Sequence, residues 1–255
     1  MSNDKYELTN ERIMVGETKL YRIKALKDIS YRVKAGELGG YIESEKNLSH
    51  EGDSWIADNA CVYGDAVVTD NAAVYGNARV YGDAIIADDA YVYGNAKVYG
   101  DAYVHGDACV YGNACVYDNA IISYDAYVSG NAKVYTDAYV SGNAKVYGNA
   151  YVSGNAKVYG DAQVYGNAII AGNACVSGNA KVYGDAQVYG DAKVYGDAQV
   201  YGNAIIAGNA CVCGNAKVYG DAQVYGDAII AGDACVYDNA KVYGDAYNKM
   251  EYYHH

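Results

Sequence analysis

The chain has 255 residues with no Phe and no Pro but 30 Gly and 32 Tyr, and its formal net charge is −12 at neutral pH. This composition is far from that of an average globular domain, and the excess of acidic residues disfavours direct binding to the phosphates of DNA or RNA. No apolar run reaches the length of a membrane-spanning helix and the polar start does not resemble a signal peptide, so we expect a cytoplasmic protein without membrane contact.

Residues 1–55 are predicted to form a small β-rich cap. We expect short strands at residues 6–8, 12–15 and 19–26. Gly16-Glu17 suits a hairpin turn, and a Gly-rich loop with a short strand is expected over residues 36–44. The cap should cover the exposed strand edges at the start of the region that follows, because a solenoid needs such a cap for solubility. Trp55 should plug the base of that region.

Residues 56–247 are 32 consecutive hexads without an insertion. Val or Ile recurs at every sixth position, Ala recurs at every sixth position, and Asn or Asp precedes each of these alanines. A fixed short period is typical of a β-solenoid, in which each unit buries its apolar edge only by stacking on its neighbours. We therefore predict an all-β rod.

One hexad predicts one strand and one corner. Ala156 and Val158 are two residues apart and point into the core, while Lys157 and Tyr159 point outward. Gly160-Asp161 forms the corner, because Gly accepts positive φ and Asp or Asn bonds locally. Where Gly is missing, the corner residues are Asp58, Asp70, Asp88, Asp118, Tyr124, Thr136 and Asp238.

The hexad Val158–Gln163 resembles the motif of the hexapeptide-repeat left-handed β-helices, although Tyr dominates its second position. That resemblance implies a triangular coil made of three hexads. Residues 20–26 and 34–48 are similar to uncharacterised phage and prophage hexapeptide proteins, some of which are labelled acyltransferases. This likeness implies a phage-associated location as an alternative to a purely cytoplasmic one.

A second periodicity favours a different coil. Among the residues that precede the core aliphatics, all eight Lys and all five Ile fall in one set of positions that recurs every second hexad. All four Gln and all six Tyr fall in the alternate set. We therefore favour a coil of two hexads, the 12-residue coil, with two parallel sheets and chemically distinct faces. The triangular left-handed coil of three hexads stays open as the alternative, with the 12-residue period then recording growth by duplication.

Outward Tyr side chains on neighbouring coils are expected to stack, because adjacent strands lie about 4.8 Å apart. Lys stems would then lie over the rings. If the protein binds a partner, the candidate residues are Tyr135, Tyr147, Tyr159, Tyr183, Tyr195, Lys133, Lys145 and Lys157.

Seven Cys, at positions without a stacking spacing, argue against a disulfide framework and for a reducing compartment. Cys211-Val212-Cys213 has no His nearby, so we expect no metal site and no cofactor. Residues 248–255 are predicted to be a C-terminal tail, in which Met250, Tyr252 and Tyr253 could plug the last coil. Alternatively, the open end pairs with another copy, which would give a homo-oligomer or filament.

The uninterrupted repeat favours a non-enzymatic structural or interaction rod, because solenoid enzymes usually carry inserted loops that build a pocket. Its partners would be another copy through the solenoid ends, or a protein or carbohydrate on a Tyr-rich face. One alternative is an acyltransferase of the hexapeptide type that uses His105 as general base, although no inserted loop or paired acid is expected beside it. Another is an acidic prophage decoy that binds a host factor.

Overall fold

The computed structural model describes residues 5–29, 33–244, 247–248 and 252–253. These residues form two compact units, residues 1–124 and residues 125–255, called unit 1 and unit 2 below. In the described part of the chain the regular structure is β-strand, apart from the short 3-10 helix η1 (Glu45–Asn47), which confirms the all-β class. None of its helices has the length and apolar character needed to cross a membrane.

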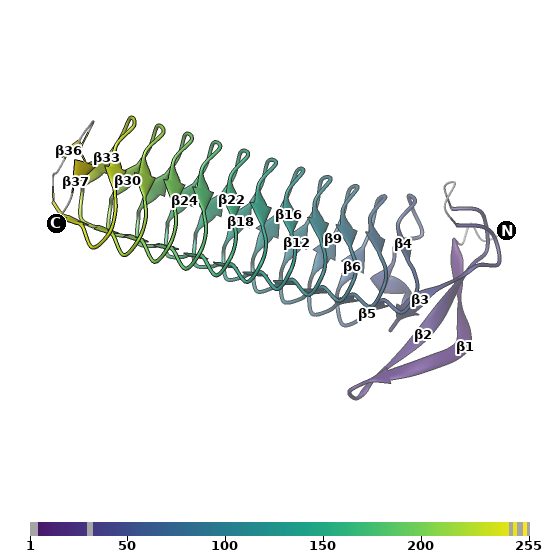
Figure 1. The fold of residues 1–255 in the computed structure, drawn as a ribbon. Helices are drawn as coiled ribbons and strands as arrows, with labels where there is room; N and C mark the ends of the chain where they lie inside the picture. Colours follow the sequence, from purple (N-terminus) through teal and green to yellow (C-terminus); the bar gives the residue numbers. More distant parts are fainter. Residues whose placement is uncertain (1–4, 30–32, 245–246, 249–251, 254–255) are drawn as a thin grey trace. The chain divides into compact units, whose positions relative to one another are not determined.

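The expected cap strands are present, and one of them pairs directly with a solenoid strand (Figure 1). β1 (Tyr6–Val15) and β2 (Thr18–Ala25) form an antiparallel hairpin around Gly16, with an irregularity within β1. β3 (Leu38–Ile42) pairs antiparallel with β2 and parallel with β5 (Cys61–Val62). The cap therefore extends a solenoid sheet through β3, and the hairpin continues that sheet beyond it.

The Lys5 side chain fixes the start of the described chain. Its ammonium group is buried and donates to the Ser54 carbonyl at 2.9 Å and to Ser54 Oγ at 3.0 Å. Burial lowers the pKa of Lys5 to about 8. Beside it, the Tyr6 ring stacks on the ring of His50 with centroids 4.4 Å apart. These contacts tie the N-terminal strand to the loop that precedes the first hexad.

In unit 1 the hexads distribute their strands over three parallel ladders, which we call sheets I, II and III. Sheet I continues from β3 with β5 (Cys61–Val62), β8 (Arg79–Val80), β11 (Lys97–Val98) and β14 (Cys115–Val116). Sheet II contains β6 (Val67–Val68), β9 (Ile85–Ile86), β12 (Tyr103–Val104) and β15 (Ile121–Ile122). Sheet III contains β4 (Trp55–Ile56), β7 (Ala73–Val74), β10 (Tyr91–Val92) and β13 (Cys109–Val110).

In unit 2 the hexads also distribute their strands over three parallel ladders, and each ladder is given the name of the sheet with the same phase of the repeat. Sheet I contains β17 (Lys133–Val134), β20 (Tyr151–Val152), β23 (Ile169–Ile170), β26 (Gln187–Val188), β29 (Ile205–Ile206), β32 (Gln223–Val224) and β35 (Lys241–Val242). Sheet II contains β18 (Tyr139–Val140), β21 (Lys157–Val158), β24 (Cys175–Val176), β27 (Lys193–Val194), β30 (Cys211–Val212), β33 (Ile229–Ile230) and β36 (Tyr247–Asn248). Sheet III contains β16 (Tyr127–Val128), β19 (Lys145–Val146), β22 (Gln163–Val164), β25 (Lys181–Val182), β28 (Gln199–Val200), β31 (Lys217–Val218), β34 (Cys235–Val236) and β37 (Tyr252–Tyr253).

The coil consists of three hexads, so the favoured 12-residue, two-sheet coil is wrong and the triangular alternative is right. Strand partners in the repeat are three hexads apart, as in the pairs Tyr91 with Cys109 and Lys181 with Gln199. A corner of two residues bends the chain by a third of a turn rather than reversing it, so three hexads are needed to close a coil. The expectation of two chemically distinct faces also fails, because lysines occur on all three sheets.

The hexad itself behaves as expected. Ala156 and Val158 have no exposed surface, and the same holds for nearly all equivalent alanines and aliphatics. The seven corner residues that replace Gly are the seven described non-Gly residues with positive φ. At the corners formed by Asp58, Asp70 and Asp88 the side chain also hydrogen bonds to the next coil, with Asp70 accepting the Asp88 N–H at 3.4 Å. Asp58 accepts the Gly76 N–H and Asp88 accepts the Gly106 N–H, each at 2.9 Å. These bonds help to offset the strain of a non-Gly residue in this conformation.

The C-terminal tail adds strands to two sheets. β36 pairs with β33 in sheet II, and β37 pairs with β34 in sheet III, both in parallel. The side chains expected to form a plug belong to Met250, which lies outside the described residues, and to Tyr252 and Tyr253, of which only the backbone is described. The plug therefore stays a prediction.

Candidate functional site

The longest aromatic ladder of the described chain lies on sheet III of unit 2. It consists of Tyr147, Tyr165, Tyr183, Tyr201, Tyr219 and Tyr237. Successive ring centroids are 4.8 to 5.4 Å apart and the ring planes deviate by at most 12°. Stacking of outward Tyr rings is thus confirmed, but between residues three hexads apart instead of two. We call this set the sheet III ladder.

The backbone register holds the rings in place. Each Tyr follows a core aliphatic residue, and the five from Tyr147 to Tyr219 donate their backbone N–H to the next coil, as Tyr165 does to the Val182 carbonyl at 3.0 Å. The rings are half-buried, and this burial raises the pKa of Tyr147, Tyr165 and Tyr183, so their phenols stay protonated at neutral pH. Since the faces of inner rings are covered by their neighbours, the ladder presents ring edges and hydroxyl groups outward.

Lys and Gln alternate in the column beside this ladder. Their order along sheet III is Lys145, Gln163, Lys181, Gln199 and Lys217. The 12-residue period explains this order. One coil of three hexads spans one and a half periods, so a position of the set that contains Lys pairs in the next coil with a position of the set that contains Gln. The period therefore keeps like charges from facing each other at a strand spacing of about 4.8 Å.

The structure separates the candidate binding residues rather than gathering them on one face. Lys133 and Tyr135 lie on sheet I, whereas Lys157, Tyr159 and Tyr195 lie on sheet II, and Lys145, Tyr147 and Tyr183 lie on sheet III. Two expected cation–π contacts are present, with Lys133 Nζ 5.2 Å from the centroid of the Tyr151 ring and Lys145 Nζ 5.8 Å from that of Tyr127. Sorting the tyrosines by every third hexad would have found the ladder.

Unit 1 carries two shorter ladders. On sheet I the stacked rings are Tyr63, Tyr81, Tyr99 and Tyr117. On sheet III they are Tyr75, Tyr93 and Tyr111. Burial together with the neighbouring tyrosines raises the pKa of Tyr99 to about 12. Both ladders begin close to the N-terminal cap.

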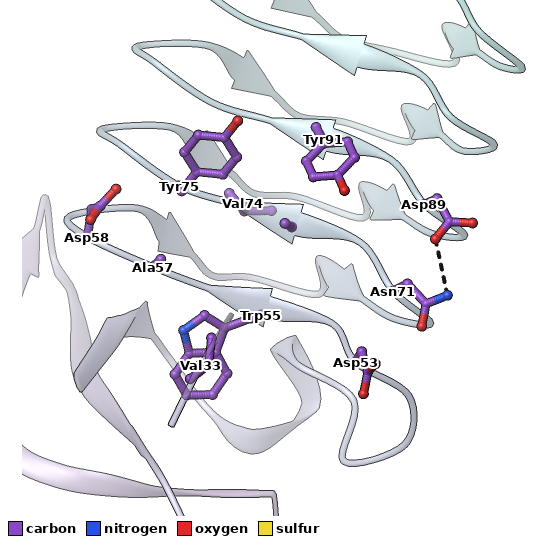
Figure 2. A pocket seen from close by; sticks show the side chains of 11 residues that line it. Val33, Asp53, Trp55, Ala57, Asp58, Asn71, Val74, Tyr75, Asp89 and Tyr91 are labelled. Carbon is purple, nitrogen blue, oxygen red and sulfur yellow. Dashed lines mark hydrogen bonds between the residues drawn. The ribbon is translucent and has the colours of Figure 1, made fainter. Parts of the chain in front are cut away.

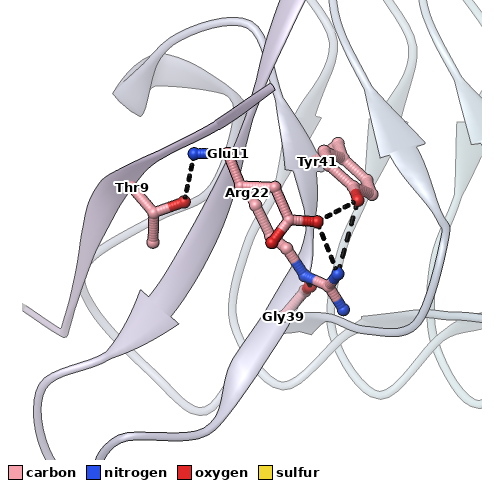
Figure 3. A network of polar contacts seen from close by, with 5 residues as sticks. All are labelled: Thr9, Glu11, Arg22, Gly39 and Tyr41. Atoms are coloured by element: carbon pink, nitrogen blue, oxygen red, sulfur yellow. Dashed lines mark hydrogen bonds and ion pairs between the residues drawn. The ribbon is translucent and has the colours of Figure 1, made fainter. Parts of the chain in front are cut away.

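A polar network fastens the β1–β2 hairpin beside the first ladder (Figure 3). The Arg22 guanidinium lies 2.8 Å from Glu11 Oε1, and the Tyr41 hydroxyl donates to the same oxygen at 2.8 Å. The hydrogen bond from Arg22 lowers the pKa of the Glu11 carboxyl. Beneath it, Leu20 packs with Tyr41 and Cys61, which buries the outward face at the start of sheet I.

A cavity of about 540 Å³ opens where sheet III begins (Figure 2). Its aromatic walls are Trp55, Tyr75 and Tyr91. Ala57, Ala73, Val33, Val74, Asn71 and the carboxylates of Asp53, Asp58 and Asp89 complete the lining. Trp55 occupies the position of β4 that precedes the core residue Ile56, and only 6% of its surface is exposed. Its ring lines this cavity and lies against Gly39 of the cap, and its expected role as a plug of the solenoid base stays a prediction.

This cavity was not expected from the sequence. Its signal is the presence of Ala57 and Ala73 at hexad positions where the next coil has Tyr75 and Tyr91. These gaps become visible only when the sequence is written with three hexads per coil.

His105 has an acidic neighbour that was not expected from the sequence. Its Nδ1 lies 3.4 Å from Asp88 Oδ2, and its ring stacks on Tyr103 with centroids 4.2 Å apart. Asp88 occupies the corner one coil earlier, which places its carboxylate beside His105. His105 is not among the residues that line the cavity.

Four segments of the chain match the family model described as YdcK Beta solenoid repeat, at residues 72–88, 162–178, 198–214 and 222–238. Each matched segment is about as long as one coil. No curated protein matches the chain. The matches and the stacked coils within each unit agree that the chain is a repeat β-solenoid protein.

Proposed function

We propose that this solenoid is a non-enzymatic scaffold that binds a partner protein through the sheet III ladder of unit 2. The observation that supports the proposal is the six-ring ladder with a Lys and Gln column at its side. Tyr is enriched in protein interfaces because its ring is apolar while its hydroxyl hydrogen bonds. Rigid rings held by stacking also lose little conformational entropy on binding.

A protein partner is favoured over a carbohydrate. Sugars bind aromatic residues through ring faces, and inside the ladder both faces of Tyr165, Tyr183 and Tyr201 are covered by neighbouring rings. The exposed edges and hydroxyls, with Lys181 and Gln199 beside them, offer hydrogen bonds and charge to a flat polypeptide surface. The ladder would thus serve as one wide interface.

A triple substitution tests this interface. Tyr165→Ser, Tyr183→Ser and Tyr201→Ser together should abolish capture of the partner from a host lysate, with the unfolding temperature nearly unchanged. Ser already occupies this hexad position at Ser153 and Ser177, so the fold should tolerate it.

The matched control replaces three tyrosines on the other two sheets, namely Tyr135, Tyr189 and Tyr195, by Ser. This control should retain the partner. Equal loss in both variants, or binding of a purified oligosaccharide that depends on the ladder, would contradict a protein interface on sheet III.

The acyltransferase remains a second candidate because of the His105–Asp88 pair. An Asp that orients a His is an arrangement that general bases use. The proposal of a scaffold predicts no acyl transfer from acyl-CoA to any tested amine or alcohol. Saturable turnover that disappears in both His105→Tyr and Asp88→Asn would establish the enzyme instead.

Two further roles are end-to-end assembly and the binding of a host factor as an acidic decoy. End-to-end assembly would use the last strands of unit 2, β35, β36 and β37, as edges for another copy. Sedimentation velocity at increasing concentration should then show species larger than the monomer. The decoy hypothesis is weaker, because within residues 125–244 Asn separates the corner aspartates along each column and dilutes the carboxylates.

A further inference from the structure

We propose that Cys211 and Cys213, on the outward side of sheet II in unit 2, bind the soft metal ion Cu(I) through their two sulfur atoms. The site is separate from the sheet III ladder that we assign to a partner protein. The proposal rests on the contact between the two thiols, on the side chains around them, and on a second copy of the same surface that lacks one thiol.

The strand places both sulfur atoms on one side of the sheet. Cys211 and Cys213 flank Val212, which has no exposed surface, so both cysteine side chains point outward. Both are half-buried, and their thiols hydrogen bond with each other. The backbone holds them in this register, because the Cys211 N–H donates to Ala228 and the Cys213 N–H donates to Ile230, at 2.8 and 2.9 Å. Two sulfur ligands are thus held side by side on a regular strand.

The neighbouring coils provide a polar side and an apolar side. On the preceding coil Lys193 pairs with Cys211, and the Tyr195 hydroxyl hydrogen bonds with both thiols, which raises the pKa of Tyr195. On the following coil Ile229 pairs with Cys211. Burial raises the pKa of Cys211, whereas the hydrogen bond with Tyr195 and the charge of Lys193 act in the opposite direction. A Cu(I) ion with two thiolates carries one net negative charge, which the nearby Lys193 offsets.

The number and type of the donors select the ion. Thiolates prefer soft ions, and Cu(I) is satisfied by two sulfur ligands, whereas structural Zn²⁺ takes four ligands. In the described part of the chain no three His, Cys, Asp or Glu residues form a group suited to a metal ion. The lack of a nearby His, on which the expectation of no metal site was based, therefore bears on zinc but not on an ion with two ligands.

A bridging ion suits this strand better than a direct disulfide. Cα atoms two residues apart in a strand are separated by about 6.6 Å, close to the upper limit of about 6.8 Å for disulfides. A Cys211–Cys213 disulfide would therefore bend the strand at Val212, whose side chain belongs to the core. An ion adds two metal–sulfur bonds to the span and leaves the strand as it is.

The chain contains a second copy of this surface with a single thiol. Residues 163–192 and 199–228 differ only in having Ser177 in the first stretch and Cys213 in the second. The one difference between the two stretches is therefore the residue that completes the pair of sulfur ligands.

The other contacts of the site are kept in this copy. Cys175 corresponds to Cys211, and Tyr159 corresponds to Tyr195. The Cys175 thiol donates to the Tyr159 hydroxyl at 3.5 Å, and this hydroxyl also hydrogen bonds with Ser177. The copy thus has the same framework with one sulfur replaced by oxygen, and it serves as an internal control.

Anaerobic titration of the reduced full-length protein with Cu(I) tests the site. Bicinchoninate serves as the competitor, because its coloured Cu(I) complex loses absorbance when the protein takes up the ion. The unchanged protein should take up one ion per chain. Cys213→Ser should weaken uptake by more than about a hundredfold, because even the loss of a residue beside a ligand costs about 10- to 100-fold. The fold should tolerate this change, since Ser177 occupies the same position in the copy.

The copy supplies a gain of binding and a matched control. Ser177→Cys completes a sulfur pair with Cys175 and should raise uptake from one ion to two, as counted by native mass spectrometry. Cys175→Ser should bind as the unchanged protein does. Circular dichroism would check that each variant is folded.

Three outcomes would overturn the site. The first is that the unchanged protein fails to compete with bicinchoninate for Cu(I). The second is that Cys213→Ser and Cys175→Ser weaken uptake equally, since that result would mean that any exposed thiol binds the ion. The third is that the folded Ser177→Cys variant takes up no additional ion.

Discussion

Units 1 and 2 are built from the same hexad but handle like charges differently. In unit 2 each described Lys of the repeat pairs across the strands with Tyr, Gln, Cys or another uncharged residue, as Lys181 does between Gln163 and Gln199. At one corner of unit 2, Asn179 donates to Asp197 at 2.9 Å and Asn215 donates to Asp233 at 2.9 Å. Charge is thus separated by alternation along every column.

Unit 1 breaks this alternation. Arg79 pairs with Lys97 on sheet I, and Asp65, Asp83 and Asp101 follow each other at one corner. The cap supplies a partial remedy, because Lys46 Nζ lies 2.6 Å from Asp65 Oδ1 and the hydrogen bond to Asp65 raises the pKa of Lys46. The comparison teaches that the regular unit needs no outside help, whereas the irregular one depends on its cap and leaves room for a cavity.

The largest expected effect comes from breaking the core of unit 2. Val158→Asp places an unpaired charge at a position with no exposed surface and should cost several kcal/mol of unfolding free energy. Val158→Ile is the control, since Ile170 and Ile206 occupy the equivalent core position. Urea unfolding followed by circular dichroism would measure both. A loss below about 1 kcal/mol for Val158→Asp would contradict a dry core.

Alkaline pH should destabilise both units through their ladders. Burial raises the pKa of several ladder tyrosines in the folded state, among them Tyr81, Tyr165 and Tyr183, and it raises that of Tyr99 to about 12, above the value of 10.0 in the unfolded chain. Their stabilising contribution is complete below pH 10 and is lost as the pH rises toward 12, because the unfolded chain releases its phenol protons first. Tyrosinate absorbance and circular dichroism should move together above pH 10. Ladder phenols that titrate at their ordinary pKa without unfolding would refute this.

A methyl group at a coil corner should cost more than one in the cap hairpin. Gly166 has φ +73°, and a Cβ there would lie 2.9 Å from both the N and the O of Gly184. Gly16 has φ +62° with no atom within 4 Å of such a Cβ. Gly166→Ala should therefore cost about 2–3 kcal/mol and Gly16→Ala about 1 kcal/mol, measured as shifts of the urea midpoint. The reverse order would mean that coil spacing yields easily.

The smallest effects should reverse sign between the units. Asn179→Asp removes the donor to Asp197 and brings three carboxylates together, so it should cost about 0.5–1 kcal/mol at low salt and less at high salt. Asp83→Asn in unit 1 relieves the run of carboxylates and should stabilise by a few tenths of a kcal/mol. Thermal unfolding at two salt concentrations measures both variants. A salt-independent difference would show that corner charge is not the cause.

The strand, the corner and the core could be read from a single hexad, because the alternation of Ala156 and Val158 and the Gly corners are local properties. The coil length could not be read from the sequence. The 12-residue period exists, but it determines which side chains pair between neighbouring coils and not how many residues one coil contains. That error carried over to the candidate site, which linked Tyr135, Tyr147 and Tyr159 although they lie on three sheets. The His105–Asp88 pair and the cavity were missed for the same reason, because both join residues on neighbouring coils.

The mismatch between a coil of three hexads and a period of two also restricts how such a gene can lengthen. Inserting one hexad would move every later hexad to the next sheet. Inserting three hexads would leave every hexad on its sheet, but at the junction two positions of the same set, such as two Lys positions, would pair with each other. Only the insertion of six hexads keeps every hexad on its sheet and also keeps the alternation of the two sets between coils. Residues 163–192 and 199–228, whose starting points are six hexads apart, differ at a single position, Ser177 against Cys213. The sequence thus already contains a near-exact repeat of six hexads, the unit by which the solenoid can be lengthened without changing which side chains pair on its surface.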